Sequence, residues 1–278
     1  MRIIEKEEFK RNVKNLLIQT HYFLPEDVIL AIKEAIKIEE GLAKDALLKI
    51  LKNAEISSCL KLPLCQDTGI PQFFLNIGKN VYFDFNLKEV LNEIVTETYN
   101  QEKFRKSSVE DPLFRRNNFN FFTFFVDYKE ENENECEVSI LIRGGGSENM
   151  SRLNLFLPTT EFQEIIKYII NEVKNMLMFT CPPVVVSIGL GGSIDTNICM
   201  TKKALLRKIG ERNKKEFYAE TEIFLKQQIN LSNIGPLGLG GKTTVLDVFI
   251  ETLPTHIATL PVSINLQCHS YRRGSIRL

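Results

Sequence analysis

The sequence has no excess of charge of either sign, because its 35 lysine and arginine residues match its 35 aspartate and glutamate residues. A chain without net charge gives no general electrostatic reason to expect nucleic acid or an anionic membrane as a partner. It lacks any apolar run of about 18 residues, so no membrane-spanning helix is expected. The charged residues 1–10 lack the apolar core of a secretory signal. These absences predict a cytoplasmic protein with neither nucleic acid nor membrane as a partner.

The composition that remains is that of a globular protein, with 44% hydrophobic and 25% charged residues. No linker, low-complexity tract or internal repeat interrupts it. Six cysteines occur in the 278 residues. In a chain without a visible signal, well-spaced cysteines more often indicate metal binding or reactivity than disulfides.

Helices are predicted where apolar residues recur three and four positions apart. This spacing occurs over residues 6–21, 25–53, 87–98 and 165–177. The run Pro25-Glu26-Asp27 is a plausible helix start, because proline and acidic residues favour the first turn.

Strands are predicted where short β-prone runs occur. These runs span residues 72–77, 121–128, 136–142, 184–188, 245–250 and 260–266. The second and third flank an acidic segment, which predicts a hairpin with a solvated loop at 129–135. Helices and strands do not alternate regularly, so we predict a mixed α+β fold. It is helix-rich in its N-terminal part, and a single domain over residues 1–278 that is compatible with two lobes.

Three cysteines lie near polar residues at positions where a predicted strand meets a loop. Cys65 precedes a glutamine and an aspartate, Cys181 precedes two prolines, and Cys268 precedes a histidine. Three thiolates from separate loops can bind one metal centre and leave a coordination position open. Their spacings of 116 and 87 residues match no zinc-finger or ferredoxin pattern. Buried, inert thiols are therefore an equally open interpretation at this point.

The sequence around the other three cysteines gives less indication of a metal site. Cys136 lies in a predicted strand, Cys199 in a helical stretch, and Cys59 after a predicted helix. We interpret all three as packing residues, since free cysteine is among the most buried residue types.

Three glycine-rich segments each follow a predicted strand or helix. Residues 143–149 contain three consecutive glycines, which let backbone amides approach an anionic ligand. Residues 189–193 follow a strand and open a helix, a geometry suited to anions. Residues 235–243 resemble a P-loop, but Pro236 stands where the first glycine is required and the preceding residues 226–233 are predicted to be helical. We therefore do not expect nucleotide binding there.

Taken together, these residues resemble the class I iron–sulfur hydro-lyases, the family of fumarate hydratase and tartrate dehydratase. The matching pieces occur in family order, at residues 64–69, 105–112, 143–149, 181–183, 189–192, 235–243 and 254–268. They cover nearly the whole chain. The joint match is highly specific, although no single piece would be.

The resemblance implies a [4Fe–4S] cluster bound by Cys65, Cys181 and Cys268, with a fourth iron that lacks a protein ligand. That iron would act as a Lewis acid on the substrate. The implied reaction is reversible loss of water from a hydroxy-dicarboxylate. Fumarate hydration to malate, a step of the tricarboxylic acid cycle, is the leading interpretation, and tartrate dehydration is the alternative.

The resemblance also implies roles for the remaining site residues. Gln66 and Asp67 would orient the hydroxyl or water and assist proton movement. Arg105 and His256 would hold substrate carboxylates, with Gln66 also contacting the substrate and His256 counted among the catalytic residues. Gly145 and Gly146 would offer backbone amides near the substrate.

This sequence departs from the family pattern in two places. Residues 116–122 stand where family members commonly show an Asn-Thr-Gly-Asp-Asn-Thr-Pro run. The family's second region, of about domain size, does not follow Leu278. We therefore expect an α subunit whose active site is completed by a separate β subunit, in an oligomer of αβ units.

Two interpretations from other classes stay open. One is a structural or binding protein whose cysteines are merely buried. The other is a non-catalytic iron–sulfur protein that transfers electrons. Such a carrier usually needs a fourth protein ligand, and no fourth cysteine has comparable polar neighbours in the sequence.

Overall fold

The structure is a computed structural model that describes residues 1–116, 118–130 and 133–278. The expected solvated loop at 129–135 and the atypical segment at 116–122 each include residues outside these ranges. The chain divides into two compact units. Unit 1 is formed by Met1–Pro25, Ala54–Gly145 and Arg272–Leu278, and unit 2 by Glu26–Asn53 and Gly146–Tyr271. The assignment of the chain to one domain stays a prediction.

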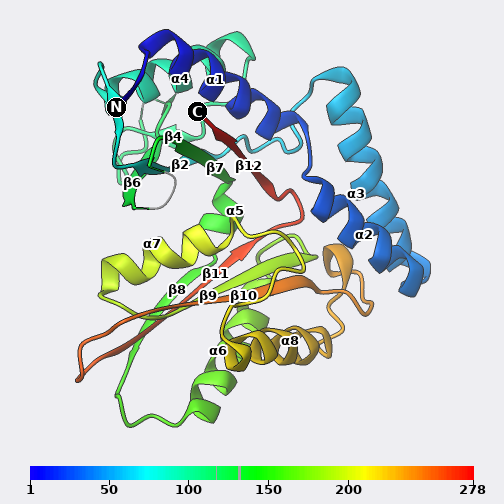
Figure 1. Ribbon diagram of the computed structural model, residues 1–278. Helices are drawn as coiled ribbons and strands as arrows, with labels where there is room; N and C mark the ends of the chain where they lie inside the picture. The colour runs from blue at the N-terminus through cyan, green and yellow to red at the C-terminus, as the bar shows by residue number, and fades with distance from the viewer. Residues whose placement is uncertain (117, 131–132) are drawn as a thin grey trace. The chain divides into compact units, whose positions relative to one another are not determined.

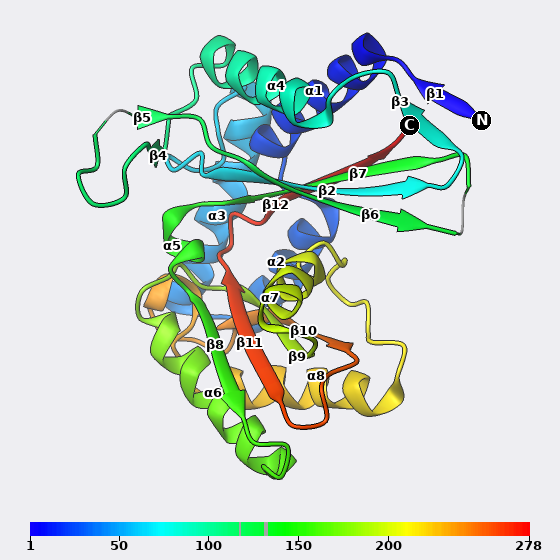
Figure 2. The same ribbon diagram turned by 90° about the vertical axis from the view of Figure 1, so that its left-hand side faces the viewer.

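Unit 1 combines two long helices with a mixed sheet. Its elements are β1 (Arg2–Ile4), α1 (Lys6–Tyr22), the end of α3 (Gly41–Leu60), β2 (Ile70–Gly78), β3 (Val81–Phe83), α4 (Leu87–Gln101), β4 (Ser108–Val109), β5 (Asn118–Phe119), β6 (Thr123–Lys129), β7 (Cys136–Arg143) and β12 (Arg272–Arg277). The main sheet has the strand order β12-β7-β2-β6. Figure 2 shows α1 and α4 on one face of this sheet.

The predicted hairpin between residues 121–128 and 136–142 is wrong, because β2 lies between the two strands. β2 pairs in parallel with β6 and antiparallel with β7. The reason is burial: nearly every residue of β2 is buried, which suits the centre of a sheet, whereas the second half of β6 is exposed. Strands that are consecutive in the sequence commonly pair as a hairpin, but here the apolar strand β2 lies between them.

Unit 2 is a second mixed sheet with helices on both faces. Its elements are α2 (Glu26–Ile38), the start of α3, α5 (Gly145–Glu148), β8 (Ser151–Phe156), α6 (Phe162–Leu177), β9 (Val184–Gly191), α7 (Ile194–Ala204), α8 (Glu216–Asn230), the 3-10 turn η1 (Pro236–Gly238), β10 (Val245–Leu253) and β11 (Leu260–Gln267). The strand order is β10-β9-β11-β8. α6 and α8 cover one face and α7 the other (Figure 1).

The two faces of β9 explain this arrangement. Val184, Val186 and Ile188 belong to the apolar core formed with α6 and α8. Ser187 and Gly189 point to the opposite face, where an added Cβ on Gly189 would lie 2.1 Å from the Thr201 Oγ1 of α7. A strand places successive side chains on opposite faces. Alternation of large and small residues therefore sets a bulky helix layer on one side and a close-packed helix on the other.

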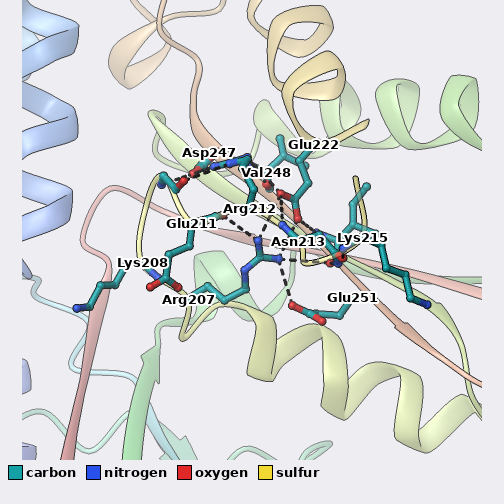
Figure 3. A network of polar contacts seen from close by, with 12 residues as sticks. Arg207, Lys208, Glu211, Arg212, Asn213, Lys215, Glu222, Asp247, Val248 and Glu251 are labelled. Carbon is teal, nitrogen blue, oxygen red and sulfur yellow. Dashed lines mark hydrogen bonds and ion pairs between the residues drawn. The ribbon is translucent and has the colours of Figure 1, made fainter. Parts of the chain in front are cut away.

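A buried ionic network fixes the segment between α7 and α8 (Figure 3). Glu222 of α8 is fully buried and accepts hydrogen bonds from Arg207 Nη1 at 2.9 Å and Arg212 Nη1 at 3.3 Å. Arg212 also pairs with the buried Asp247 of β10, and Arg207 with Glu251 at 3.1 Å. Because the charges are paired and hydrogen-bonded, burial of Glu222 and Asp247 is tolerated.

The predicted fold class is confirmed: the structure is a mixed α+β arrangement. α1, α4 and α6 cover the predicted helices. The helical stretch predicted over 25–53 is instead two helices, because the chain breaks at residues 39–40 and Gly41 has a φ of +53°. None of the helices in the described ranges combines the length and apolarity that crossing a bilayer requires.

Candidate active site

In unit 1, three of the predicted site segments form a clamp around the carboxylate of Asp67. Asp67 Oδ2 accepts the Gly145 N–H at 2.7 Å. Asp67 Oδ1 accepts the Gly69 N–H at 3.0 Å and the Ser107 hydroxyl at 2.9 Å. The loop after Cys65, the loop after β7 and the segment after Arg105 therefore meet at one carboxylate. These are three of the motifs that the sequence analysis singled out.

The clamp also sets the charge of Asp67. Partial burial raises the pKa of this carboxyl, but hydrogen bonds from Gly145, Ser107 and Gly69 favour the ionised form, and the charge of Arg272 adds to them. The net effect is a pKa below the usual value. Asp67 is therefore an anchored anion at neutral pH.

Glycine is required at the turn that carries this loop into β2. Gly69 has a φ of +70°, and an added Cβ would lie 2.5 Å from the backbone oxygen of Arg143. Beside it, the Thr68 hydroxyl donates to the backbone oxygen of Arg105 at 2.6 Å. This bond ties Arg105 to the loop, while the Arg105 and Gln66 side chains are exposed and free to meet a ligand.

In unit 2, the chain segments of two predicted cluster cysteines are side by side. The His269 N–H donates to the backbone oxygen of Cys181 at 3.3 Å, and His269 Nδ1 lies 3.2 Å from the same oxygen. The Cys268 N–H donates to Ser147 Oγ at 3.3 Å. Gly146, next to Ser147, is thereby held near the segment of Cys268.

His256 lies in the loop between β10 and β11 and is exposed. Its Nδ1 accepts the Ala258 N–H at 3.1 Å, which leaves Nε2 as the ring nitrogen that can donate a hydrogen bond. The loop is held by the Thr255 hydroxyl, which donates to the Gly192 oxygen at 3.1 Å. His256 thus presents an Nε2–H donor, a group that can bind a carboxylate.

Unit 1 thus holds Cys65, Gln66, Asp67, Arg105 and Gly145, and unit 2 holds Gly146, Cys181, His256 and Cys268. The Gly145 amide, predicted to face the substrate, donates instead to Asp67. Sequence reasoning missed Ser107 and Ser147. The only signal for either was its position within a matched segment, 105–112 for Ser107 and 143–149 for Ser147.

The cysteines differ in burial in a way that bears on their roles. Cys65 and Cys268 are half-buried and Cys181 is exposed, so the full burial that the interpretation as inert thiols assumed is contradicted. Cys136 is buried, as predicted for a packing residue, whereas Cys59 is exposed, which contradicts that assignment. Within the described ranges, no group of three or more His, Cys, Asp or Glu side chains is gathered around a single metal-ion position.

In the segment that resembles a P-loop, backbone amides bind a carboxylate of the protein itself. Glu39, 3% exposed, follows α2 and accepts the Thr243 N–H at 2.5 Å and the Lys242 N–H at 3.0 Å. An added Cβ on Gly241 would lie 2.7 Å from this carboxylate. The amides that would bind a phosphate already hold a carboxylate of the protein, which agrees with the expectation that no nucleotide binds here.

With this geometry in place, comparison with known proteins decides the family. The model of the fumarate hydratase (fumerase) family matches residues 10–277. The chain belongs to the fumarate hydratase family. The resemblance to this group of hydro-lyases is thereby confirmed, and it covers both units of the structure.

Curated relatives of this fumarate hydratase-family chain are α subunits. The putative L(+)-tartrate dehydratase subunit alpha of Methanocaldococcus jannaschii is 39% identical over 280 residues, covering 96% of each chain. The L(+)-tartrate dehydratase subunit alpha of Escherichia coli K12 is 28% identical over 257 residues, covering 91% of this chain and 85% of the relative. The match thus extends over nearly the full length of α-subunit chains.

Proposed function

We propose that this chain is the α subunit of a two-subunit hydro-lyase that removes water reversibly from a four-carbon hydroxy-dicarboxylate. The observation that supports this most directly is the anchored Asp67 carboxylate, two residues from Cys65, in a chain that the family model matches from residue 10 to 277. A proton acceptor held beside a metal-ligand candidate is what dehydration requires.

The cofactor of this proposal is a [4Fe–4S] cluster held by Cys65, Cys181 and Cys268. The donor chemistry fits, since thiolates are the usual ligands of such clusters and none of these cysteines is fully buried. The contact between His269 and Cys181 brings two of the three ligand segments together. When bound, the cluster supplies Lewis-acid polarisation of the leaving hydroxyl group.

The chain's own residues bind the substrate and move the proton. The exposed guanidinium of Arg105 suits a bidentate contact with one carboxylate, and His256 Nε2–H donates to the other. The exposed Gln66 side chain orients the hydroxyl group. Asp67 accepts the proton, since its carboxylate is ionised and its oxygens are held by backbone and hydroxyl donors. The Gly146 amide is a further donor to the substrate.

Different observations support the two candidate substrates. Fumarate, with malate as its hydrated form, follows from the family whose model spans the chain. L-tartrate follows from the relatives, which carry the name tartrate dehydratase. The same relatives are named α subunits, which supports a β subunit as the partner. We propose fumarate hydration as the first activity to measure and tartrate dehydration as the second.

The decisive experiment measures cluster and activity together under anaerobic conditions. Iron and sulfide are determined in the wild type and in the Cys65→Ser, Cys181→Ser and Cys268→Ser variants, with Cys59→Ser as the matched control. We expect each of the first three to lose iron and sulfide, and the control to retain them. Wild-type iron content in all three variants would contradict the cluster assignment.

Activity is then assayed with fumarate, malate and L-tartrate, with and without the cognate second subunit. We expect activity with one of these substrates only when both subunits are present. Equal activity of the isolated chain would refute the two-subunit proposal. A cluster whose spectrum does not respond to any dicarboxylate would favour an electron carrier.

A further inference from the structure

The glycine-rich loop at residues 235–243, which binds no nucleotide in our interpretation, contacts the chain segment of Cys181. The Leu237 N–H of this loop donates to the backbone oxygen of Pro182 at 2.9 Å. Leu237 has a φ of +53°, a conformation that costs a residue other than glycine about 1–2 kcal/mol. Such a backbone persists where its surroundings fix it. The contact with Pro182 therefore depends on what holds the loop.

The first half of the loop is closed by its own hydrogen bonds. The Gly240 N–H donates to the Ile234 oxygen at 2.9 Å, and the Gly235 N–H donates to the Thr244 hydroxyl oxygen at 3.0 Å. Just after the loop, the Thr244 backbone oxygen accepts the N–H of Val184, the first residue of β9, at 3.0 Å. The loop is thus bonded to the start of β9 as well as to itself.

The second half of the loop is held by the carboxylate of Glu39, which is about 200 positions away in the sequence. This carboxylate is 3% exposed and accepts the N–H groups of Lys242 at 3.0 Å and Thr243 at 2.5 Å. An added Cβ on Gly241 would lie 2.7 Å from Glu39 Oε2 and 2.8 Å from the Cβ of Ala43. Hydrogen bonds to an ionised acceptor are strong, and buried N–H groups that lose their acceptor are costly. Glu39 therefore fixes the backbone at residues 241–243.

Two different parts of unit 2 hold consecutive carbonyl groups of the Cys181 segment. The oxygen of Cys181 accepts the His269 N–H at 3.3 Å, and the oxygen of Pro182 accepts the Leu237 N–H at 2.9 Å. The Cys181 side chain itself is exposed. An exposed thiol is thus carried by a backbone segment that the chain holds from two sides.

We propose that Glu39 is a positioning residue for Cys181: its carboxylate fixes the glycine-rich loop, and the loop fixes the Cys181 segment through the bond from Leu237 to Pro182. Glu39 touches neither substrate nor metal. The consequence for the cluster rests on the proposed function, because only that proposal makes Cys181 a ligand. The ordering of the loop and of the Cys181 segment is independent of it.

The test compares Glu39→Gln, which replaces one of the two acceptor oxygens by an amide nitrogen, with Glu39→Asp, which keeps the carboxylate on a shorter side chain. Glu40→Gln is the matched control, because Glu40 is the next residue, is exposed and loses the same charge. The first measurement is hydrogen exchange of the metal-free full chain at the amide of Leu237, which donates to Pro182. It requires neither a cluster nor activity.

In Glu39→Gln we expect the Leu237 amide to exchange at least about tenfold faster, while the amides in the middle of β9 keep wild-type rates. Glu39→Asp should lie between this variant and the wild type, and Glu40→Gln should match the wild type. Unchanged exchange at Leu237 would overturn the inference. Equal acceleration throughout β9 would overturn it too, because it would show a general loss of stability.

Gly241→Ala decides the question where Glu39→Gln does not fold. Its added Cβ meets the Glu39 carboxylate, whereas in Gly240→Ala the added Cβ meets no atom within 4 Å. Both glycines have a positive φ, so both variants carry backbone strain and only the first disturbs Glu39. We expect faster exchange at Leu237 in Gly241→Ala than in Gly240→Ala, and equal rates would overturn the inference.

The second measurement follows iron release to a chelator from the anaerobically reconstituted full chain. Groups that hold metal ligands in place commonly contribute 10- to 100-fold to metal affinity. We expect Glu39→Gln to release iron at least about tenfold faster than the wild type, Glu39→Asp to recover part of this loss, and Glu40→Gln to match the wild type. Equal release from Glu39→Gln and Glu40→Gln would overturn the positioning role. A wild-type chain that takes up no iron would contradict the proposed function alone, because the exchange measurement would still test the inference.

Discussion

The carboxylate of Asp67 accepts the backbone N–H of Gly145 at 2.7 Å, although 78 positions separate the two residues in the sequence. The contact joins the loop that follows Cys65 to the glycine-rich turn that follows β7. Their hydrogen bond makes them one structure, and it also explains why the turn contains glycine next to the bond.

Gly144→Ala is expected to displace Asp67 from the clamp. An added Cβ at this position would lie 2.7 Å from Asp67 Oδ2, closer than Cβ atoms pack, and 3.1 Å from its Cγ. The carboxylate must move, and a misplacement of about 1 Å at a reacting group costs about 100-fold in rate. We expect a loss of this size in kcat, measured by steady-state kinetics of the two-subunit complex.

The matched control for stability is Gly146→Ala, where an added Cβ meets no atom within 4 Å. Both variants should have thermal unfolding midpoints close to that of the wild type. A wild-type kcat in Gly144→Ala would show that the position of Asp67 in the clamp is unimportant for turnover.

Glu222→Gln is expected to destabilise unit 2. The carboxylate of Glu222 accepts from Arg207, Arg212 and the backbone of Ile250 at 2.8 Å, at a position with no solvent access. Removing its charge leaves two half-buried cations undercompensated around a fully buried group, at a cost of about 3–5 kcal/mol in the free energy of unfolding. Urea denaturation measures this change. Glu220→Gln, on an exposed position of the same helix, should shift it by less than about 0.5 kcal/mol; equal shifts would contradict the role of the network.

Much of the fold could be predicted from the sequence, because the relevant signals are local. The apolar stripe of α6 and the buried run of β2 are visible in the residues themselves. What could not be predicted is which strands are neighbours. β6 and β7 are consecutive in the chain, yet β2 separates them, and no pattern within either strand encodes that choice.

The candidate site was predictable as a set of motifs but not as contacts. Asp67 and Gly145 were both identified, yet their bond depends on the register of β2 against β7, which places Ile70 opposite Arg143. Glu39 is the opposite case. Nothing in its local sequence shows that it fills the amides of residues 242 and 243. Long-range partners of backbone donors are set by the tertiary fold, so local patterns do not reveal them.

His21 should make the protein less stable in mild acid. Burial, aided by the charge of Arg272, lowers its pKa well below the usual value, so the folded state keeps the ring neutral. The unfolded chain takes up a proton below about pH 6.5. Stability from this group is therefore complete above that pH and is lost as the pH falls, by up to about 1.4 kcal/mol per pH unit.

His21→Phe tests this, because phenylalanine keeps a ring beside Phe104, whose centroid lies 4.1 Å away, and does not titrate. The free energy of unfolding, measured in urea at pH 7.5 and at pH 5.5, should fall more steeply in the wild type than in the variant. Parallel slopes would mean that the buried imidazole is not neutral in the folded protein.

We expect the Cys136 thiol to be much less reactive than the Cys59 thiol. Burial raises its pKa to about 12, and the sulfur lies in the core between the sheet and α1. Thiolates, not thiols, react with alkylating agents. In the metal-free native chain we expect iodoacetamide to modify the exposed Cys59 at least about a hundredfold faster than Cys136, as read by peptide mass spectrometry.

Denaturation provides the control for that measurement, because the unfolded chain exposes both thiols. In urea, Cys59 and Cys136 should react at similar rates, and a Cys59→Ser variant should leave native Cys136 unmodified. Rapid native alkylation of Cys136 would mean that the edge of the sheet near β12 opens on the time scale of the reaction.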